Sequence, residues 1–412
     1  MYLQKVNVIK ESYGQGIQLL SREGNDVERA DIIIVGGGVM GSSTAYSLRK
    51  TGFEGSILVF EKDPTYEYSS TARSAGGFRQ LYSTSINIQL SRFSLGVYKK
   101  FAEEMSLGGD KAEIDFKQRG YLFLATKQML PAFAKQLVTQ NGLGVPSELL
   151  SVNELLNIIP ELETSDLAGG LFCKEDGYLD PYSVMKAYRK NAQAMGVEYI
   201  SAEVASLITN KCQMGGVRLV DGTVFSCSIV INCAGAWGAK LSEDMGLPLP
   251  VVPLKRQMYI VDTAKKLERM LPLTIDPTGV YFRHEGDKVV VGFSEDVKPG
   301  IDFNWRRSSF DNLWPILAHR IPNFESLKLK SGWAGMYDHN TVDQNAIIGE
   351  HPLMRGYFVA IGFSGHGMQQ APGVGLGLAE LICKGKYETL DLTPLRVERF
   401  AEDDLVLEDA IV

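Results

Sequence analysis

The chain of 412 residues is long enough for two domains or one large interleaved domain, and 45% of its residues are hydrophobic, as in globular proteins. Its formal net charge of −7 at pH 7 gives nucleic acid no reason to bind. No run reaches the roughly 18 apolar residues of a membrane helix, so no membrane span is expected. No C-x-x-C or H-E-x-x-H motif occurs, and we therefore expect no disulfide framework and no metal site. The five cysteines are Cys173, Cys212, Cys227, Cys233 and Cys383.

Residues 1–29 are expected to form an N-terminal extension or an added edge element. They contain no apolar segment typical of a secretory signal, and their acidic residues are unlike those of an acid-poor transit peptide. The cysteine usage favours a reducing compartment. These features together predict a cytoplasmic protein, and a processed or trimmed start stays open.

The stretch from Asp31 to Gly41 reads D-I-I-I-V-G-G-G-V-M-G. Its β-branched run predicts a strand buried on both faces, and the glycines fit the G-x-G-x-x-G pattern before a helix over 42–50. A second strand over 56–60 ends at Glu61, 20 positions after Gly41, where a dinucleotide fold places its ribose-binding acid. An acid there disfavours a 2′-phosphate and hence NADP. The alternative is a tight turn that binds no ligand.

The middle of the chain begins with a small-residue loop, T-A-R-S-A-G-G-F-R-Q over 71–80, which suits close approach to a flat ligand or an ordinary flexible loop. A strand and turn are expected over 171–181. Asp221-Gly222 predicts a hairpin, and a buried strand over 229–232 leads into C-A-G-A-W-G. Helices are expected over 87–104, 130–140, 151–159, 182–195 and 308–320. Further strands are expected over 120–126, 197–200, 204–208, 217–220 and 223–225.

The last third is rich in strands from 247 to 291, where Tyr281, Phe282 and Arg283 share one predicted strand. A buried strand over 357–361 precedes the glycine-dense stretch 362–377. We expect this stretch to be a turn that opens a helix over 378–383 and directs its N-terminus at a cofactor.

Five motifs in this order resemble the D-amino-acid oxidase-like family of flavoproteins, which includes glycine oxidase and sarcosine oxidase. They are V-G-G-G-V-M-G with Glu61, A-R-S-A-G-G-F-R-Q, I-N-C-A-G-A-W, D-Q-N-A-I-I-G and G-F-S-G-H-G-M-Q-Q-A-P-G-V-G. The resemblance covers residues 31–395. It implies an α/β fold, in which a Rossmann-like FAD-binding domain carries an inserted β-rich α+β substrate domain. The expected limits are 30–95, 180–240 and 340–412 for the FAD-binding domain, and 96–179 and 241–339 for the substrate domain.

The resemblance also implies bound FAD. Its residues would be Gly36, Gly38, Val39, Met40, Gly41, Glu61, Lys62, Arg73, Ser74, Ala75, Gly76, Gly77, Val204, Ala234, Gly235, Trp237, Gly362, Phe363, Ser364, Gly365, His366, Gly367 and Met368. Family members that link the flavin covalently carry a cysteine or a histidine where this chain has Gly335 or Arg73, so we expect non-covalent FAD. Sarcosine oxidases hold the substrate carboxylate with a lysine at the position of Gln369.

The implied reaction is oxidation of the C–N bond of a small amino acid or secondary amine by hydride transfer to flavin N5. We expect Arg283 to hold the substrate carboxylate, with Arg79 as second candidate, although Arg283 could instead pair with Glu285 or Asp287 on the surface. His366 is expected beside the flavin, or else in a capped turn. Tyr259 and Tyr337 are expected to contact substrate, or else to lie in the core.

Two other functions stay open at this point. One group of the family is associated with assembly of respiratory complex I, which suggests a flavoprotein assembly factor in the mitochondrial matrix. The fold also serves 2-hydroxy-acid and glycerophosphate oxidoreductases. The expected partners are a small-molecule substrate and either a protein electron acceptor or respiratory-chain subunits. Lys255, Lys265 and Lys266 are candidates for a lysine that activates oxygen, but none lies in a clear motif. The sequence leaves the oligomeric state open.

Overall fold

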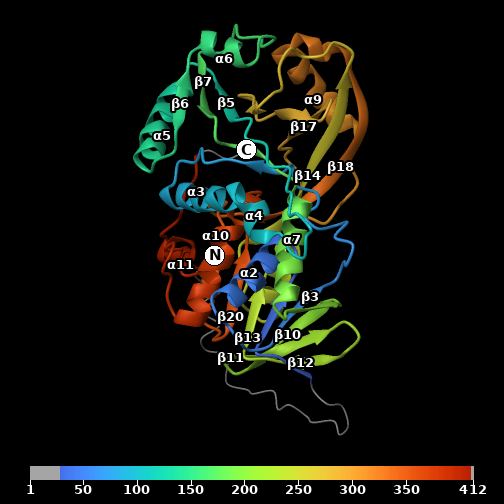
Figure 1. The fold of residues 1–412 in the computed structure, drawn as a ribbon, viewed down its shortest axis with the longest axis vertical. Coiled ribbons are helices and arrows are strands. Elements are labelled where there is room, and N and C mark those ends of the chain that lie inside the picture. Colours follow the sequence, from blue (N-terminus) through green and yellow to red (C-terminus); the bar gives the residue numbers. More distant parts are fainter. Residues whose placement is uncertain (1–27, 410–412) are drawn as a thin grey trace.

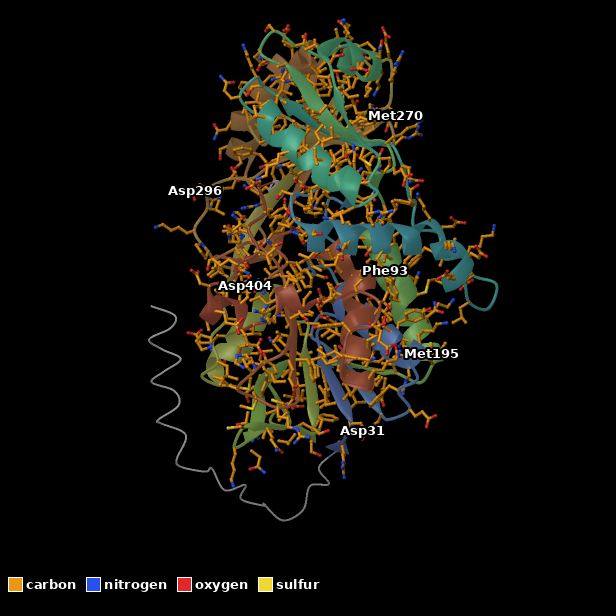
Figure 2. The ribbon with its side chains drawn as sticks, turned by 90° about the vertical axis from the view of Figure 1, so that its left-hand side faces the viewer. Asp31, Phe93, Met195, Met270, Asp296 and Asp404 are labelled. Atoms are coloured by element: carbon orange, nitrogen blue, oxygen red, sulfur yellow. The ribbon has the colours of Figure 1, made fainter. Side chains whose placement is uncertain are left out.

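The computed structural model describes residues 28–409. Figure 1 shows an elongated molecule with one large sheet in each half. Figure 2 places Asp31 near the lower end, Met270 near the upper end and Phe93 of helix α3 between them. The helices labelled in the lower half of Figure 1 are α2 (Val39–Lys50), α7 (Pro181–Ala194), α10 (Gly367–Lys384) and α11 (Arg399–Glu402). Those labelled in the upper half are α5 (Leu130–Gly142), α6 (Val152–Ile158) and α9 (Arg307–Arg320), and α3 (Ser85–Lys99) and α4 (Phe101–Met105) lie between the two halves. The short helix α8 (Gly238–Asp244) follows β13 (Ile229–Asn232) in the chain.

The sheet of the lower half has six strands, all parallel except for the edge strand β19. The inner strands are short runs of β-branched and aromatic residues buried on both faces, as parallel sheets require. In spatial order the strands are β19 (Ile347–Glu350), β20 (Tyr357–Ile361), β13 (Ile229–Asn232), β2 (Ile32–Val35), β3 (Ile57–Glu61) and β9 (Glu198–Ser201).

Alternate residues of β2 pack against different layers. Ile32 and Ile34 belong to the core formed with α2, α7 and α10, whereas Ile33 and Val35 belong to the core formed with a smaller sheet. That sheet contains β1 (Glu28–Arg29), β12 (Val224–Ser226), β11 (Gln213–Leu219) and β10 (Val204–Asn210). The six-stranded sheet is therefore covered on both faces, which leaves the carboxyl ends of its strands for binding.

The sheet of the upper half has eight strands, and only the β15–β5 pair is parallel. In order they are β18 (Leu327–Asn340), β14 (Val251–Thr263), β17 (Lys288–Phe293), β16 (Tyr281–Glu285), β15 (Leu273–Ile275), β5 (Tyr121–Ala125), β7 (Gly169–Cys173) and β6 (Ser147–Leu150). Pairing of β15 with β5 joins two chain segments that lie far apart in sequence. A two-stranded ribbon, β4 (Gly77–Phe78) with β8 (Gly177–Tyr178), completes the set.

The strands of the six-stranded sheet come from three stretches of the chain, and those of the eight-stranded sheet come from two. The predicted mixed α/β fold is confirmed. We retain the domain limits given above as a proposal, because they follow this alternation. Of the N-terminal extension, only Glu28 and Arg29 fall among the described residues, as a strand that pairs in parallel with β12; the rest lies outside the described residues.

Two expected helices differ from the structure. The helix over 87–104 is two helices, α3 and α4, which meet at Lys100. Helix α10 begins at Gly367, so the expected turn over 362–377 is mostly helix and contains Pro372. Its glycines serve packing rather than turning: a Cβ on Gly375 would lie 2.4 Å from Ser43 Oγ on the adjacent α2. Close helix contact has overridden the low helix propensity of glycine here.

Candidate active site

A cavity of about 400 Å³ lies between the two large sheets. It runs from the carboxyl ends of β2 and β3, past the start of α2, to side chains of β14, β16 and β18. Open α/β sheets bind their ligands at the carboxyl ends of the strands. One end of this cavity therefore lies where a nucleotide cofactor would bind, and the other lies against the eight-stranded sheet.

Most of the residues expected to bind the cofactor line this cavity. They are Gly36, Gly38, Val39, Met40, Glu61, Lys62, Arg73, Ser74, Ala75, Gly77, Val204, Ala234, Gly235, Trp237, Phe363, Ser364, Gly365, His366, Gly367 and Met368. Three expected residues, Gly41, Gly76 and Gly362, are not among the lining residues, and the atoms around them leave little room for a side chain. A Cβ on Gly76, for example, would lie 2.1 Å from the Leu179 carbonyl oxygen.

The glycine-rich turn after β2 forms a cradle of backbone. Gly36 has φ +97°, and a Cβ on it would lie 2.5 Å from the Cys233 carbonyl oxygen. A Cβ on Gly41 would lie 1.9 Å from the Gly36 carbonyl oxygen, so glycine allows α2 to begin close to the strand. The N–H of Val39 donates to Thr71 Oγ1 at 3.1 Å. The positive end of α2 thus meets the cavity, with the Thr71 hydroxyl at its first N–H, and this arrangement fits a pyrophosphate.

Glu61 lies at the end of β3 and is held by the backbone. Its Oε2 accepts from the Gly37 N–H at 2.8 Å, and its Oε1 accepts from the Asp63 N–H at 2.9 Å. Burial raises the pKa of Glu61, and these two hydrogen bonds oppose the rise. Each carboxylate oxygen has two lone pairs, so the group can also accept from the hydroxyls of a ribose.

The nucleoside end of the cavity has a flat aromatic wall. Trp237, in the turn after β13, stacks on Phe303 with centroids 6.3 Å apart. Lys62 Nζ lies 3.9 Å from the centroid of the Trp237 ring. Val204 and Ala234 contribute apolar surface beside it. This wall suits a planar base, and Lys62 also pairs with Glu203 at 3.5 Å.

The two positions at which relatives link flavin covalently lie next to each other. A Cβ on Gly335 of β18 would lie 3.1 Å from Arg73 Cβ. Arg73 is engaged elsewhere, because its Nε donates to the Glu67 carbonyl and its Nη1 donates to the Ala334 carbonyl at 2.8 Å. Neither position offers a thiol or an imidazole, in agreement with non-covalent binding.

His366, Arg79 and Gln369 form one corner of the cavity. Arg79 is fixed there at both ends. Its backbone N–H donates to Gln369 Oε1 at 2.7 Å, and its side-chain Nη1 donates to the Leu81 carbonyl at 2.6 Å. His366 Nε2 lies 3.4 Å from Arg79 Nη2. Burial and the Arg79 charge lower the pKa of His366 to about 3, so this imidazole is neutral at physiological pH.

Arg256 of β14 lines the part of the cavity that faces the eight-stranded sheet. Its Nη1 donates to two backbone carbonyls, those of Lys255 at 3.1 Å and Glu295 at 3.3 Å, whereas its buried Nε has no hydrogen-bond partner. Among residues 28–409 no carboxylate lies within 4.0 Å of its guanidinium. Arg256 Cζ stands 5.3 Å from the centroid of the Tyr337 ring. The guanidinium can therefore receive an anionic ligand.

The walls around Arg256 are aromatic and apolar. Tyr337 lines the cavity, as expected, together with Tyr121 and Tyr281, and Met258 and Leu273 add apolar surface. These side chains exclude water, and an ion pair formed at Arg256 is strengthened in such surroundings.

Arg283 is not the carboxylate-binding residue that we expected. Its Nη2 and Nε donate to the Ala75 carbonyl at 2.9 and 3.2 Å, its Nη1 contacts Glu285, and its guanidinium stacks 4.4 Å from the Tyr178 ring centroid. It does not line the cavity. Arg283 instead holds the loop that contains Ala75. Its ion-pair partner, Glu285, is one of the two carboxylates expected as an alternative to the substrate.

Tyr259 lies in the core, which is the second of the two places expected for it, and it does not line the cavity. Its hydroxyl donates to the Arg306 carbonyl at 3.0 Å and its ring packs against Trp305 and Phe310. Successive residues of a strand face opposite sides. Arg256 and Met258 face the cavity, and the odd-numbered neighbour Tyr259 therefore faces away from it.

Sequence reasoning also missed Asp338, which follows Tyr337 on β18. Asp338 Oδ2 accepts from the Gly362 N–H at 2.8 Å and thereby ties β18 to the loop before α10. Burial raises the pKa of Asp338 to about 6. In the sequence, Asp338 begins the tripeptide D-H-N, which has no periodicity or spacing that marks a site.

Within the described part of the chain, no three side chains of His, Cys, Asp or Glu are grouped to hold a metal ion. No helix among the same residues is both long and apolar enough to cross a membrane.

A glycine cradle on a mostly parallel sheet, facing a mostly antiparallel sheet across one cavity, is the arrangement of an oxidoreductase that uses a nucleotide cofactor. The chain belongs to the DAO family, FAD dependent oxidoreductase, which residues 31–381 match. It is an enzyme of this family, and FAD is its cofactor.

Individual relatives match most of the chain. FAD-dependent oxidoreductase domain-containing protein 1 of Xenopus laevis is 38% identical over 425 residues, which cover 93% of this chain and 85% of the relative. The L-proline dehydrogenase of P. horikoshii has 28% identity and a TM-score of 0.84, and the match covers 92% of this chain and 100% of that one. The glycine oxidase of Geobacillus kaustophilus has 26% identity and a TM-score of 0.78, with 90% and 99% covered.

Proposed function

We propose that the protein oxidises a carbon–nitrogen bond of a small amino acid or secondary amine that carries one carboxylate. The observation that carries this proposal is Arg256, which lines the cavity and has no carboxylate within 4.0 Å of its guanidinium among the described residues. Burying a substrate carboxylate is unfavourable unless a cation or hydrogen-bond donors receive it. Two structurally similar proteins are named for the oxidation of amino acids, proline and glycine, and this supports the same substrate class here.

FAD, when bound, supplies the acceptor for a hydride from the carbon beside the substrate nitrogen, and the resulting imine hydrolyses in water. The residues of the chain provide binding and orientation. Arg256 would bind the carboxylate through Nη2, because its Nε is buried and its Nη1 donates to two backbone carbonyls, and this charge-assisted contact would fix the direction of the substrate. Met258 and Leu273 exclude water beside it. His366 stays neutral and adds no charge that would compete for the carboxylate.

The proposal is tested by mixing the holoenzyme without oxygen with a panel of amino acids and secondary amines and following loss of the flavin absorbance near 450 nm. The panel includes L-proline, glycine and sarcosine, and also lactate and glycerol 3-phosphate to test hydroxyl oxidation. We expect bleaching by at least one amino acid. Bleaching by the hydroxy compounds alone would replace this proposal with the alternative reaction.

We further infer that the electron acceptor is not oxygen. Lys255, considered above, is paired with Asp302 at 2.6 Å and does not line the cavity, and neither Lys265 nor Lys266 lines it. The lysines that do line it, Lys62 and Lys240, accompany the nucleoside wall. A dye, quinone or protein acceptor should therefore reoxidise the reduced enzyme much faster than air does, and rapid reoxidation in air would contradict this inference.

A further inference from the structure

Residues 294–306 join β17 to α9 without forming a helix or a strand. A connection of this length that has no secondary structure is uncommon in a compact protein and usually has a function. Figure 2 shows Asp296, near the start of this connection, below Met270 and above Asp404. We name the second part of the connection, residues 300–306, the clasp.

The clasp follows strand β14 and is tied to it at both ends. The Gly300 N–H donates to the Pro253 carbonyl at 2.9 Å, and the Arg306 N–H donates to Gln257 Oε1 at 2.7 Å. Between these two ties, Lys255 of the same strand holds the middle of the clasp. The clasp is therefore fixed to the eight-stranded sheet along its whole length.

Lys255 pins a tight turn in the clasp. Its Nζ donates to Asp302 Oδ2 at 2.6 Å and to the Asn304 carbonyl at 3.1 Å, and the Asn304 N–H donates to Asp302 Oδ1 at 3.0 Å. The side chain of Lys255 is 7% exposed. The hydrogen bond from Lys255 lowers the pKa of Asp302 to about 2, so this ion pair is intact at neutral pH. One buried lysine of β14 thus fixes both neighbours of Phe303.

Phe303, at the tip of this turn, contacts side chains that follow strands of the other sheet. Its ring stacks on Trp237 with centroids 6.3 Å apart and meets the Tyr68 ring edge to face at 4.9 Å. Arg73 Cζ lies 5.2 Å from the centroid of the Phe303 ring. Trp237 follows β13, whereas Tyr68 and Arg73 follow β3, and all three line the cavity. Phe303 does not line the cavity, and it therefore joins two of its walls from behind.

The contacts of the clasp can break at a small cost. Phe303 is only half-buried, and its neighbours Ile301 and Trp305 are 46% and 39% exposed, so little apolar surface holds the turn in place. Each contact joins one part of the chain to another, so the contacts hold the walls together in the empty protein as well as in the loaded one. Release of the turn would free Trp237 and Tyr68 to move apart.

We propose that the clasp controls the entry and release of FAD: Phe303 holds two walls of the cofactor site together, and Lys255 is the positioning residue that fixes Phe303. This role concerns the cofactor alone and is independent of the substrate proposed above. An element that must open changes the association and dissociation rate constants by the same factor and leaves the dissociation constant unchanged. A residue that only contributes binding free energy raises the dissociation rate constant and the dissociation constant together.

The experiment starts from the holoenzyme. The dissociation rate constant is measured from the exchange of bound FAD for an excess of radiolabelled FAD, and the dissociation constant is measured by equilibrium dialysis. Phe303→Ala and Lys255→Met should each raise the dissociation rate constant by about tenfold, because the aromatic and cation contacts of the clasp are lost or released. The dissociation constant should change by less than about threefold in both variants. If Lys255→Met does not fold, Phe303→Ala decides the matter.

Matched variants separate the clasp from a general loosening of the fold. Phe303→Tyr keeps the aromatic ring and should retain the wild-type rate constant within about twofold. Ile301→Ala shortens an exposed side chain of the same segment and should have no effect. Lys266→Met, which removes an exposed lysine paired with Asp262, is the control for Lys255→Met and should also have no effect.

The double variant Lys255→Met, Phe303→Ala tests whether the lysine acts through the ring. Its dissociation rate constant should exceed that of Phe303→Ala by less than about twofold, and multiplication of the two single effects would contradict the positioning role. Unchanged rate constants in both single variants would overturn the proposal. A rate constant and a dissociation constant that rise by the same factor would also overturn it, because Phe303 would then contribute only to binding.

Discussion

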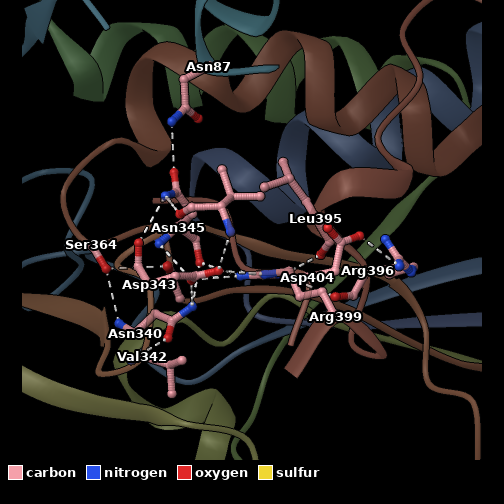
Figure 3. Close-up of polar contacts among 12 residues, drawn as sticks. Asn87, Asn340, Val342, Asp343, Asn345, Ser364, Leu395, Arg396, Arg399 and Asp404 are labelled. Carbon is pink, nitrogen blue, oxygen red and sulfur yellow. Dashed lines mark hydrogen bonds and ion pairs between the residues drawn. The ribbon is translucent and has the colours of Figure 1, made fainter. Parts of the chain in front are cut away.

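Removal of the Asp343 carboxylate should destabilise the fold, because it leaves the Arg399 guanidinium buried without its counter-charge. Both side chains are 0% exposed, and Asp343 accepts from Arg399 Nε at 2.8 Å and from Nη2 at 3.0 Å (Figure 3). The same carboxylate also accepts from Asn340 Nδ2 at 2.7 Å. Loss of one partner of a buried ion pair costs about 3–5 kcal/mol.

This free energy converts to a measurable temperature. For a chain of about 400 residues the unfolding entropy is roughly 0.8 kcal/mol per kelvin, so Asp343→Ala should lower the melting temperature by about 4–6 °C. The assay is thermal unfolding of the FAD-loaded protein, followed by tryptophan and flavin fluorescence. The control is Lys384→Ala, which removes an exposed i,i+4 pair with Glu388 and should shift the melting temperature by less than about 1 °C.

The double variant Asp343→Ala, Arg399→Met tests the reasoning itself. Because it removes the stranded charge, it should be more stable than Asp343→Ala alone. If the single variant loses less than about 1 °C, or if the double variant is no more stable than it, the buried charge does not determine the stability of this region.

Three further predictions concern the cofactor site. Glu61→Ala should weaken FAD binding by about tenfold or more, because charge-assisted hydrogen bonds to the ribose are lost. An unchanged dissociation constant for FAD would count against the ribose-binding role. Acid precipitation should release all yellow FAD into the supernatant, because Gly335 and Arg73 offer no linking group, and flavin in the pellet would contradict this. The pKa of Asp338 is about 6 when folded and ordinarily 3.8, so between these values the unfolded chain has lost a proton that the folded chain keeps. The melting temperature of the wild type should therefore fall relative to that of Asp338→Asn as pH rises from about 4 to 6, and parallel curves would refute the shift.

The cofactor half of the site could be predicted from sequence because its signals are local. The glycine spacing, the β-branched run and Glu61 all lie within Asp31 to Glu61, where strand, turn and helix follow one another directly. The geometry of that turn, with φ +97° at Gly36, is what the spacing requires. Cofactor-binding residues far away in the sequence, such as Trp237, were predicted only from the resemblance to a flavoprotein family, because no local pattern indicates them.

The substrate half could not be predicted in the same way. Arg283 lies on a predicted strand and Arg256 in the region expected to be rich in strands, and only the register of β14, β17 and β16 decides which of them meets the cavity. The strand period places Arg256 and Tyr259 on opposite faces, but it does not say which face is inside. Helix α10 was misjudged for a related reason, since its glycines allow close packing that the sequence does not show, of Gly375 against Ser43 of α2 and of Gly373 against Leu90 of α3.

The central claim is that Arg256 anchors a substrate carboxylate beside the flavin. The most direct test compares the rate of flavin bleaching without oxygen for an amino acid substrate and for the corresponding amine without its carboxylate, in the wild type and in Arg256→Met. The variant should lower kcat/KM for the amino acid by about 30-fold or more, equivalent to about 2 kcal/mol, and should change the rate with the amine by less than about threefold. Equal effects on both substrates, with FAD content intact, would contradict the account.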